Sequence, residues 1–568
     1  MARFSTKKVA VEPTETNFMG EKAFLLKPKE EFVSSIMTTF LSKEGSYYES
    51  SNEEVKRILS LLDKIDPLFA CKAAIYVREN GNMRSISHLL GAALANYISG
   101  QEYAKRFYNK LIVRPDDMTE ILSAYAKLNG MSDNDVKKIP NSMKKGFKEA
   151  LEGLDAYRID KYKMKTRSFS LVDLVRLFHP KATQKNAEAY KRLIEGKSLA
   201  DLYSSKILEK EMTKAGQKTK DMTEKDKVEA KKEAITAVID NVKGMPVMNL
   251  LRNLRNILLY APDKVTEACE QLIIKDKIMN SRLLPFRFAT AYSEIEKMSY
   301  YTEISSTKSS IQFEDEKSSS LCSENEFRRN KEMVLNAIEK ALEISCLNIP
   351  KLEGNVAVLV DDSGSMRGDA GGSSRVSAFS KTSTSMIAHL FASMVMYRQD
   401  NVYLGLFGDK LINVPVKRDM RLLDYTKWTF EKGGECGGAT ETGIYDFIRQ
   451  VVKEKKKIDN VIVFSDCQIG SIHTKGYYGG YSEFTAWYGH NSSDRGKHFH
   501  ELFKEFRNIN PNANFIVVNL RQSGSTSVFD KSQRILNIAG WSDKIFDVIT
   551  SQCKGWDAMI KEIESIEI

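Results

Sequence analysis

The feature that most constrains this chain is a change of hydrophobic pattern near residue 350. Before it, apolar residues recur at helical spacing, as Val55, Ile58 and Leu62 do on one face of an expected helix. After it, short continuous apolar runs alternate with helical stretches. The two patterns require different architectures. We therefore predict two domains, an all-helical one at residues 1–345 and an α/β one at residues 346–568.

Helical segments follow one another through the first domain with almost no strand pattern between them. We expect helices at Pro67–Glu79, Ser85–Ile98, Met118–Leu128, Met143–Leu154 and Leu171–Phe178. Stacked helix pairs of the HEAT-like kind would bury each apolar face against the next pair. The sequence shows no clean period, so the repeat architecture depends partly on a resemblance given below.

The second domain shows buried strands separated by helices. We expect strands at Asn355–Val360, Val402–Phe407, Asn460–Phe464 and Asn514–Leu520, with a weaker last strand at Lys544–Val548. The helices between them are expected at Thr384–Tyr397, Gly443–Lys456 and Lys497–Phe506. Continuous apolar strands with helical crossovers favour a doubly wound α/β fold, with a parallel sheet covered on both faces.

Composition argues against several other classes of protein. Hydrophobic residues make up 42% and charged residues 28% of the chain, as in ordinary globular proteins. No apolar run reaches the roughly 18–20 residues that span a bilayer, and the first residues lack the apolar core of a signal peptide. The 7 cysteines include no C-x-x-C pair. We expect a cytoplasmic protein with reduced thiols and no membrane partner.

Positive charge is concentrated in the first domain. The net charge is +10, of which residues 1–345 carry +9 and residues 346–568 carry +1. Residues 141–200 alone sum to +7. Clustered lysine and arginine attract polyanions such as nucleic acids, because bound phosphates release their counterions. On charge alone, an ordinary solvated surface explains the pattern equally well.

Oxygen-bearing side chains gather where two of the expected strands end. Asp361, Ser363 and Ser365 form a D-x-S-x-S sequence directly after the first strand. Thr440 stands in a glycine-rich loop before a helix, and Asp466 follows the third strand. Hard cations prefer oxygen ligands, so these five residues predict a site for a divalent cation, with Mg²⁺ the expected ion.

Some alternatives remain open at this site. Thr442 is a second candidate for the threonine ligand, and Asp362 is the weaker carboxylate because it occupies an x position. Asp361 and Ser363 could instead only cap turns. Taken together, the five ligand candidates and their order along the chain resemble the metal-ion-dependent adhesion site of von Willebrand factor A domains.

Five short stretches of the first domain resemble, in order, the TROVE domain shared by telomerase-associated, Ro and vault proteins. They are Arg78–His88, Val113–Met118, Asp160–Lys163 with Asp173–Pro180, Met245–Leu254 and Leu284–Phe288. A TROVE module followed by a von Willebrand A-like domain is the architecture of the Ro ribonucleoprotein family. The resemblance covers nearly the whole chain and implies a ring of HEAT-like repeats closed by the A-like domain.

The same resemblance implies RNA partners and no catalysis. Ro-family proteins bind small noncoding Y RNAs on an outer basic surface and single-stranded 3′ ends of misfolded RNAs through a central hole. By motif, Lys161 and His179 match positions implicated in Y RNA binding. The implied role is a scaffold in RNA quality control or ribonucleoprotein assembly, with a ribonuclease or another protein as a further partner of the A-like domain.

The residues of the basic stretch agree with this implication. Lys161, Lys163, Lys165 and Arg167 stand beside Tyr162 within residues 141–200. Cations neutralise phosphates, and aromatic rings stack on unpaired bases. The alignment between Lys161 and His179 leaves open which further cation takes part.

The candidate RNA-binding residues divide into two pairs. We expect Arg84 and His88 to face the central passage, and Lys161 and His179 to lie on or beside the outer rim. Either histidine could instead be a structural residue inside the fold.

Two functions other than RNA binding are compatible with a metal site at Asp361 to different degrees. The alternative function is a metal-dependent protein-interaction module that captures an acidic residue of a partner. A metal-dependent hydrolase is disfavoured, because no second metal cluster or base–nucleophile pair accompanies Asp361.

Two segments look longer than the family core requires, the Lys/Glu-rich stretch 206–235 and the Tyr/Gly-rich loop 469–497. Either could serve a partner specific to this protein.

Overall fold

The structure is a computed structural model that describes part of the chain. It describes residues 15–16, 22–23, 27–38, 51–81, 83–131, 139–163, 169–202, 229–230, 232–236, 245–281, 283, 285–300, 323–368, 383–438, 441–466, 499–520, 534–539, 545–546, 549–550 and 556–568. Most of the Lys/Glu-rich stretch 206–235 and the whole loop 469–497 lie outside these residues.

The first half of the chain begins with a stack of helices. They are α1 (Pro28–Thr38), α2 (Ser51–Leu62), α3 (Pro67–Glu79), α4 (Arg84–Tyr97), α5 (Ala104–Leu111), α6 (Pro115–Leu128), α7 (Asn141–Glu152), α8 (Ala156–Lys161), α9 (Leu171–Phe178) and α10 (Ala187–Ile194). Helix α3 packs on α4, α4 on α6, α5 on α7 and α7 on α9. The helices expected at Pro67–Glu79 and Leu171–Phe178 have the predicted bounds.

Local signals in the sequence fix where these helices begin and how closely they pack. Asp66 caps α3 by accepting a hydrogen bond from the backbone N–H of Phe69 (3.0 Å), and Ser170 caps α9 in a reciprocal pair with Asp173. A Cβ at Gly146 of α7 would lie 2.5 Å from the Cβ of Tyr108 on α5. Glycine is therefore required there for the close approach of the two helices.

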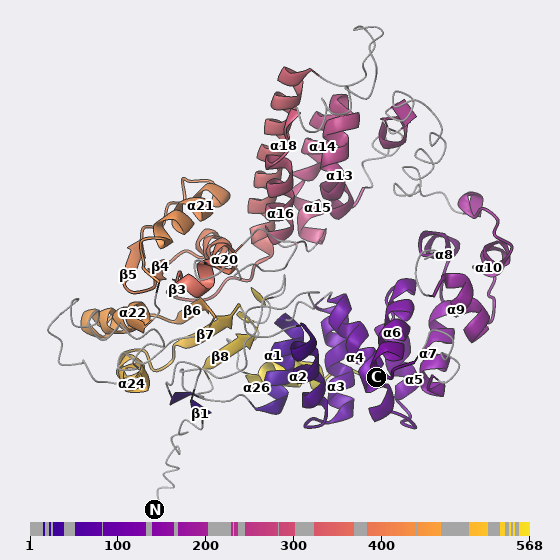
Figure 1. Ribbon diagram of the computed structural model, residues 1–568, viewed down its shortest axis with the longest axis horizontal. Coiled ribbons are helices and arrows are strands. Elements are labelled where there is room, and N and C mark those ends of the chain that lie inside the picture. The colour runs from indigo at the N-terminus through magenta and orange to yellow at the C-terminus, as the bar shows by residue number, and fades with distance from the viewer. Residues whose placement is uncertain are drawn as a thin grey trace, which may run out of the picture.

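A second helical group follows after residue 245. It contains α13 (Val247–Tyr260), α14 (Val265–Leu272), α15 (Lys275–Ser281), α16 (Pro285–Glu296) and the long α18 (Glu324–Ser345). Helix α18 packs along α14, α15 and α16 and then leads through a short 3₁₀ turn into the sheet domain (Figure 1). None of the described helices is long and apolar enough to cross a membrane.

The second half folds around a six-stranded sheet with the order β5-β4-β3-β6-β7-β8. The strands are β3 (Val356–Asp361), β4 (Val402–Phe407), β5 (Leu411–Val414), β6 (Asn460–Ser465), β7 (Asn514–Asn519) and β8 (Ile535–Ala539). All neighbouring pairs are parallel except β4 and β5. The predicted parallel sheet is therefore correct apart from one antiparallel edge strand, which returns directly from β4.

Helices cover both faces of the sheet, as expected for a doubly wound fold. Val356, Val358 and Val360 belong to the core that contains α20 (Thr384–Arg398) and α21 (Leu422–Gly433). The alternate residues of β3, Ala357 and Leu359, belong to the core that contains α22 (Glu441–Glu454) and α24 (Phe499–Ile509). Burial on both faces explains why the strand sequences are continuously apolar.

The last strand differs from the prediction. The strand expected at Lys544–Val548 is wrong, because residues 545–546 and 549–550 are helical, and the last strand is β8. Ile545 and Ile549 are both buried. Their spacing of four residues places both on one face of a helix, and the apolar content alone could not distinguish this from a strand.

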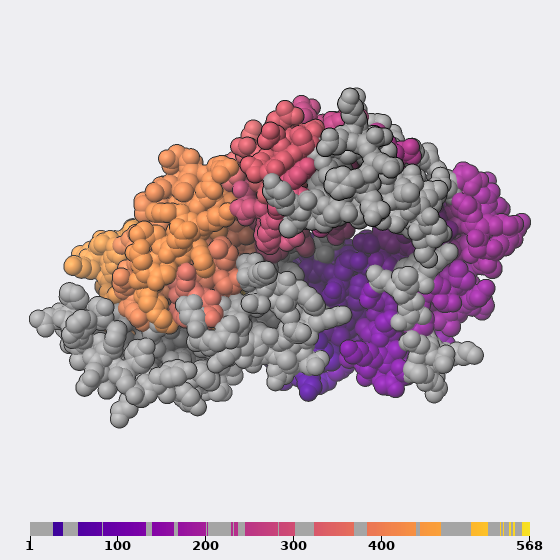
Figure 2. Space-filling view, turned by 45° about the horizontal axis from the view of Figure 1, so that its top comes forward, coloured from indigo at the N-terminus to yellow at the C-terminus, as the bar shows by residue number. Residues whose placement is uncertain are grey.

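The start of the helical half meets the end of the sheet domain. Helix α1 packs against β8, and the C-terminal helix α26 (Trp556–Glu564) packs against α1 and α3. Lys29 of α1 forms an ion pair with Glu564 (2.8 Å), and the ammonium group of Lys72 donates to the carbonyl oxygen of Glu564 (2.5 Å). Figure 2 shows a hollow between the early helices and the group α13–α18.

Candidate functional site

The predicted metal ligands lie at the switch point of the sheet. Strands β3 and β6 are neighbours, and the chain leaves β3 toward β4 on one side but leaves β6 toward β7 on the other. Ligands of doubly wound sheets bind beyond the carboxyl ends of strands at such a point. Asp361 ends β3, and Asp466 follows Ser465 at the end of the adjacent β6. All three residues are fully buried.

Short contacts order the loop after β3. The hydroxyl of Ser465 donates to Asp361 Oδ2 (2.6 Å), and the backbone N–H of Ser363 donates to Asp361 Oδ1 (3.0 Å). The hydroxyl oxygens of Ser363 and Ser365 are 3.1 Å apart. The structure therefore brings Asp361, Ser363 and Ser365 together and places Asp466 on the neighbouring strand end.

The threonine candidates lie at the margin of the described residues. The backbone N–H of Gly364 donates to the carbonyl of Gly438 (3.0 Å), which brings the glycine-rich loop beside the D-x-S-x-S loop. Thr440 and the side chain of Thr442 lie outside the described residues.

The electrostatics of this edge suit a cation. Burial raises the pKa of Asp361 above its usual range, and the negative charge of Asp466 raises it further. A divalent ion would stabilise both ionised carboxylates, and the serine hydroxyls would supply further oxygen ligands. The described residues contain no cluster of three or more His, Cys, Asp or Glu side chains suited to a metal.

Asp362 belongs to a separate buried network. Its carboxylate contacts Arg367 (2.8 Å), the Ser385 hydroxyl (2.7 Å) and Nε2 of His389 (2.9 Å). Burial alone would raise the pKa of Asp362, but the charge and hydrogen bond of His389 bring it below the usual value. Sequence analysis missed this network; the one signal was a histidine inside an apolar helix.

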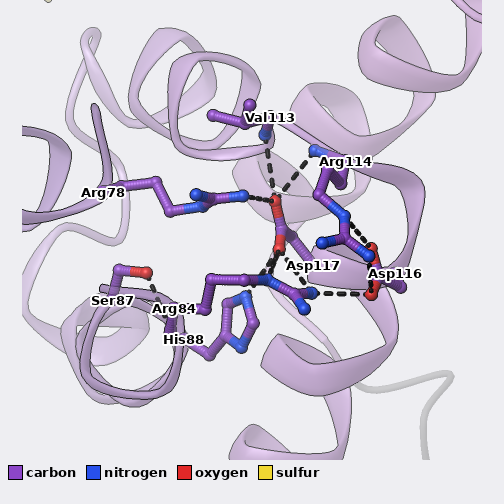
Figure 3. Close-up of polar contacts among 8 residues, drawn as sticks. All are labelled: Arg78, Arg84, Ser87, His88, Val113, Arg114, Asp116 and Asp117. Carbon is purple, nitrogen blue, oxygen red and sulfur yellow. Dashed lines mark hydrogen bonds and ion pairs between the residues drawn. The ribbon is translucent and has the colours of Figure 1, made fainter. Parts of the chain in front are cut away.

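The early TROVE-like motif forms a network around Asp117 (Figure 3). The side chain of Asp117 is fully buried. Its Oδ2 accepts hydrogen bonds from Arg78 (2.7 Å) and from the backbone N–H groups of Val113 (3.1 Å) and Arg114 (2.9 Å). Burial would raise the pKa of Asp117, but hydrogen bonds from His88 and Arg78 hold it well below its usual range.

Arg84 and His88 are both held by this network. His88 Nε2 lies 2.8 Å from Asp117 Oδ1, and the histidine is buried. Arg84 contacts Asp117 Oδ1 (3.0 Å) and Asp116 Oδ2 (2.7 Å), with 30% of its side chain exposed. Burial lowers the pKa of His88 despite the nearby carboxylate. Of these two predicted RNA-binding residues, Arg84 is partly exposed at the surface, whereas His88 is buried.

The second predicted pair lies on α8 and α9. Lys161 Nζ donates to the Tyr157 hydroxyl (3.2 Å) and lies 5.4 Å from the centre of that ring. Lys163 forms an ion pair with Asp160 (2.8 Å). His179 is exposed and ends α9 in the left-handed conformation, with φ of 47°. The remaining two candidates, Lys165 and Arg167, lie outside the described residues.

Arg114 connects the two pairs and was missed in the sequence. Its Nε lies 3.1 Å from Asp116 Oδ1, and its guanidinium lies 4.8 Å from the centre of the Tyr162 ring. Tyr162 adjoins Lys161, whose ammonium group is 5.9 Å from the same ring. The only sequence signal was an arginine directly before the proline and two aspartates that start α6.

The sequence and the fold have recognisable relatives. The TROVE domain family matches residues 10–238 and 228–354. Telomerase protein component 1 of Rattus norvegicus is 22% identical over 125 residues, and that of Mus musculus is 20% identical over 141 residues. These matches cover 21% and 24% of this chain but only 5% of each relative.

A solved structure covers nearly the whole chain. The crystal structure of the Deinococcus radiodurans Ro protein (RSR) aligns with 93% of this chain and 99% of its own, with a TM-score of 0.58 and 15% identity. This likeness confirms the predicted architecture, a helical-repeat ring followed by a von Willebrand A-like α/β domain.

Proposed function

The chain belongs to the TROVE-domain family of RNA-binding ribonucleoprotein components, and from that premise we propose that it is a noncoding-RNA-binding scaffold without catalytic activity. Its RNAs are small Y-RNA-like molecules and the single-stranded 3′ ends of misfolded RNA. Its role is RNA quality control or ribonucleoprotein assembly in the cytoplasm. The family match over residues 10–354 is the observation that carries the proposal.

The surface of α7 to α10 supports an outer site for folded RNA. Exposed basic side chains cluster there: Lys145, Lys148, Arg158, Arg176, Lys181, Lys185 and Lys191. Lys161 lies among them with two tyrosine rings close by. Such a surface binds phosphates through charge, and its aromatic side chains can stack on unpaired bases.

Copurification tests the proposal directly. The full chain carries 4 Trp and 23 Tyr, which fix the absorbance expected at 260 and 280 nm for protein alone. We expect excess absorbance at 260 nm from bound RNA, and sequencing should identify a small structured RNA. A preparation without RNA that also fails to bind folded RNA and 3′-overhang RNA at low salt would contradict the proposal.

A metal-dependent protein contact is a second function of the same chain. Asp361, Ser363, Ser365, Thr440 and Asp466 would hold one divalent cation, expected to be Mg²⁺. The supporting observation is the buried carboxylate pair with two serine hydroxyls at the switch point. When bound, the ion supplies an open coordination position for an acidic side chain of a partner protein such as a ribonuclease.

Pull-down from lysate tests this second function. We expect Mg²⁺-dependent capture of a protein partner that is lost with EDTA and with Asp361→Ala. Equal capture by wild type and variant would contradict a metal-mediated contact.

A further inference from the structure

The network around Asp116 and Asp117 holds more positive than negative charge. Three arginines, Arg78, Arg84 and Arg114, face two carboxylates. Arg78 is buried with 2% of its side chain exposed, whereas Arg84 and Arg114 are 30% and 40% exposed. The surplus positive charge is therefore presented at the surface by Arg84 and Arg114.

One carboxylate oxygen holds these two exposed arginines close together. Asp116 Oδ2 lies 2.7 Å from Nη2 of Arg84 and 3.1 Å from Nη2 of Arg114. The two nitrogens are thus separated by no more than the sum of these distances. A guanidinium has five N–H donors, and the contacts with the aspartates run through Nε and Nη2 of each arginine. A phosphate can approach both guanidinium groups at once.

An aromatic ring lies one step away from this arginine pair. The guanidinium of Arg114 lies over the Tyr162 ring at 4.8 Å, and Lys161 Nζ lies 5.9 Å from the ring centre. Arginine planes and tyrosine rings both stack on unpaired bases. The arginine pair is followed by an aromatic ring, just as the phosphate of a nucleotide is followed by its base in single-stranded RNA.

We propose that Arg84, Arg114 and Tyr162 form a subsite for one unpaired nucleotide of single-stranded RNA. Arg84 and Arg114 bind its phosphate, and its base stacks on Tyr162 beside the Arg114 guanidinium. The subsite rests on the proposed RNA-binding function and deepens it, because it joins the Arg84 and Lys161 regions into one continuous track.

Binding of a fluorescent single-stranded RNA of about ten nucleotides tests the subsite. Loss of one stacked base should weaken affinity about tenfold, so Tyr162→Leu should show this loss and Tyr162→Phe should not. Arg114→Ala should weaken binding and reduce the slope of log affinity against log salt by about one unit. Arg106→Ala on α5, an exposed arginine outside the subsite, is the matched control and should behave as wild type.

An abasic scan separates stacking from a purely structural role. Replacing nucleotides one at a time by an abasic unit should reveal one position where the tenfold penalty of Tyr162→Leu disappears. If Tyr162→Leu does not fold by circular dichroism, a scan with single uncharged methylphosphonate linkages replaces the abasic scan, and the penalty of Arg114→Ala should then disappear at one linkage. Equal penalties at every position would overturn the subsite.

The two possible failures are distinguishable. If wild type binds neither folded nor single-stranded RNA, the proposed function itself fails. If wild type binds but the Arg114 and Tyr162 variants match Arg106→Ala, the function stands and the subsite is wrong.

Discussion

Two pairs of aspartates, Asp116 with Asp117 and Asp361 with Asp466, lie in opposite electrostatic settings in the two halves of the molecule. Asp116 and Asp117 are surrounded by arginines, and the pKa of Asp117 is held low. Asp361 lies near another carboxylate, Asp466, and burial together with that charge raises its pKa. The first pair already has its cations and leaves positive charge for an anion. In our proposal, the second pair is completed by a cation from solution.

This difference separates the two ligand classes that we propose. A carboxylate pair surrounded by arginines is a poor metal site, because the guanidinium groups already compensate its negative charge. A buried pair beside hydroxyl groups has the oxygen ligands that Mg²⁺ prefers. Two neighbouring carboxylates therefore predict little about the ligand of a site until their partners are known.

The largest effect should come from Asp117→Asn. The change leaves Arg78 and Arg84 against a neutral amide in a buried site, and breaking a buried ion pair costs about 3–5 kcal/mol. Urea unfolding measures the loss. The matched control Asp173→Asn removes an exposed capping carboxylate on α9 and should cost about 1 kcal/mol. Equal losses would mean that the arginine network adds little stability.

The contribution of Asp117 to the free energy of unfolding should depend on pH in a defined direction. The pKa of folded Asp117 lies below its ordinary value of 3.8, so its stabilising contribution is complete above about pH 4. It should disappear as the pH falls below that value. Wild type should lose more stability than Asp117→Asn between pH 5 and pH 2.

Asp361→Ala should have the next largest effect, and only when metal is present. A ligand at a hundred times its Kd stabilises the folded state by about 2.7 kcal/mol. Wild type should therefore melt at higher temperature with Mg²⁺, and Asp361→Ala should not respond. Asp362→Ala is the informative control, since it breaks the His389 network but leaves the proposed ligands in place. An equal Mg²⁺ shift in wild type and Asp361→Ala would contradict the ligand assignment.

The double variant Lys161→Ala, Lys165→Ala should lower the affinity for RNA and leave the free energy of unfolding unchanged. Each lost phosphate contact lowers the slope of log affinity against log salt by about one unit. Binding of a folded small RNA should weaken, most clearly at low salt. Affinity unchanged at two salt concentrations would exclude this surface.

The smallest effect is a difference in preference between two single variants. Arg84→Ala should weaken binding of a single-stranded 3′ end more than that of folded RNA, and Lys161→Ala should do the reverse. Competition between the two RNAs measures the ratio. Because Arg114 and Tyr162 connect the two regions, we expect a preference of only a few-fold rather than complete separation. If both variants lose both RNAs equally, the two regions form a single site.

Local patterns in the sequence were enough to predict many helices and four strands of the sheet, but few of the side-chain partners. Pro67 and Ser170 mark helix starts, and the continuous apolar run of β3 indicated a buried strand, because these signals act within a few residues. The D-x-S-x-S loop was placed correctly for the same reason. The strand predicted at Lys544–Val548 failed where apolar content suited both a helix and a strand.

Contacts between distant segments could not be predicted. The link from Arg84 to Asp117 spans 33 residues, and that from Asp362 to His389 spans 27. Nothing in the local pattern of either arginine or histidine indicates which carboxylate it will meet. Tyr162 was recognised as a candidate for stacking, but its cationic neighbour Arg114 became evident only when α6 and α8 were placed in space.

The contact of α26 with the first helices has a consequence for folding during synthesis. Lys72 meets the carbonyl of Glu564, which follows it by 492 residues. The surfaces of α1 and α3 that pack against α26 therefore stay uncovered until residues 556–564 have been synthesised. Exposed apolar surface of this kind promotes aggregation during folding. A chain interrupted before α26 would keep that surface exposed. Loss of this helix should therefore reduce the yield of soluble protein before it affects the binding of any ligand.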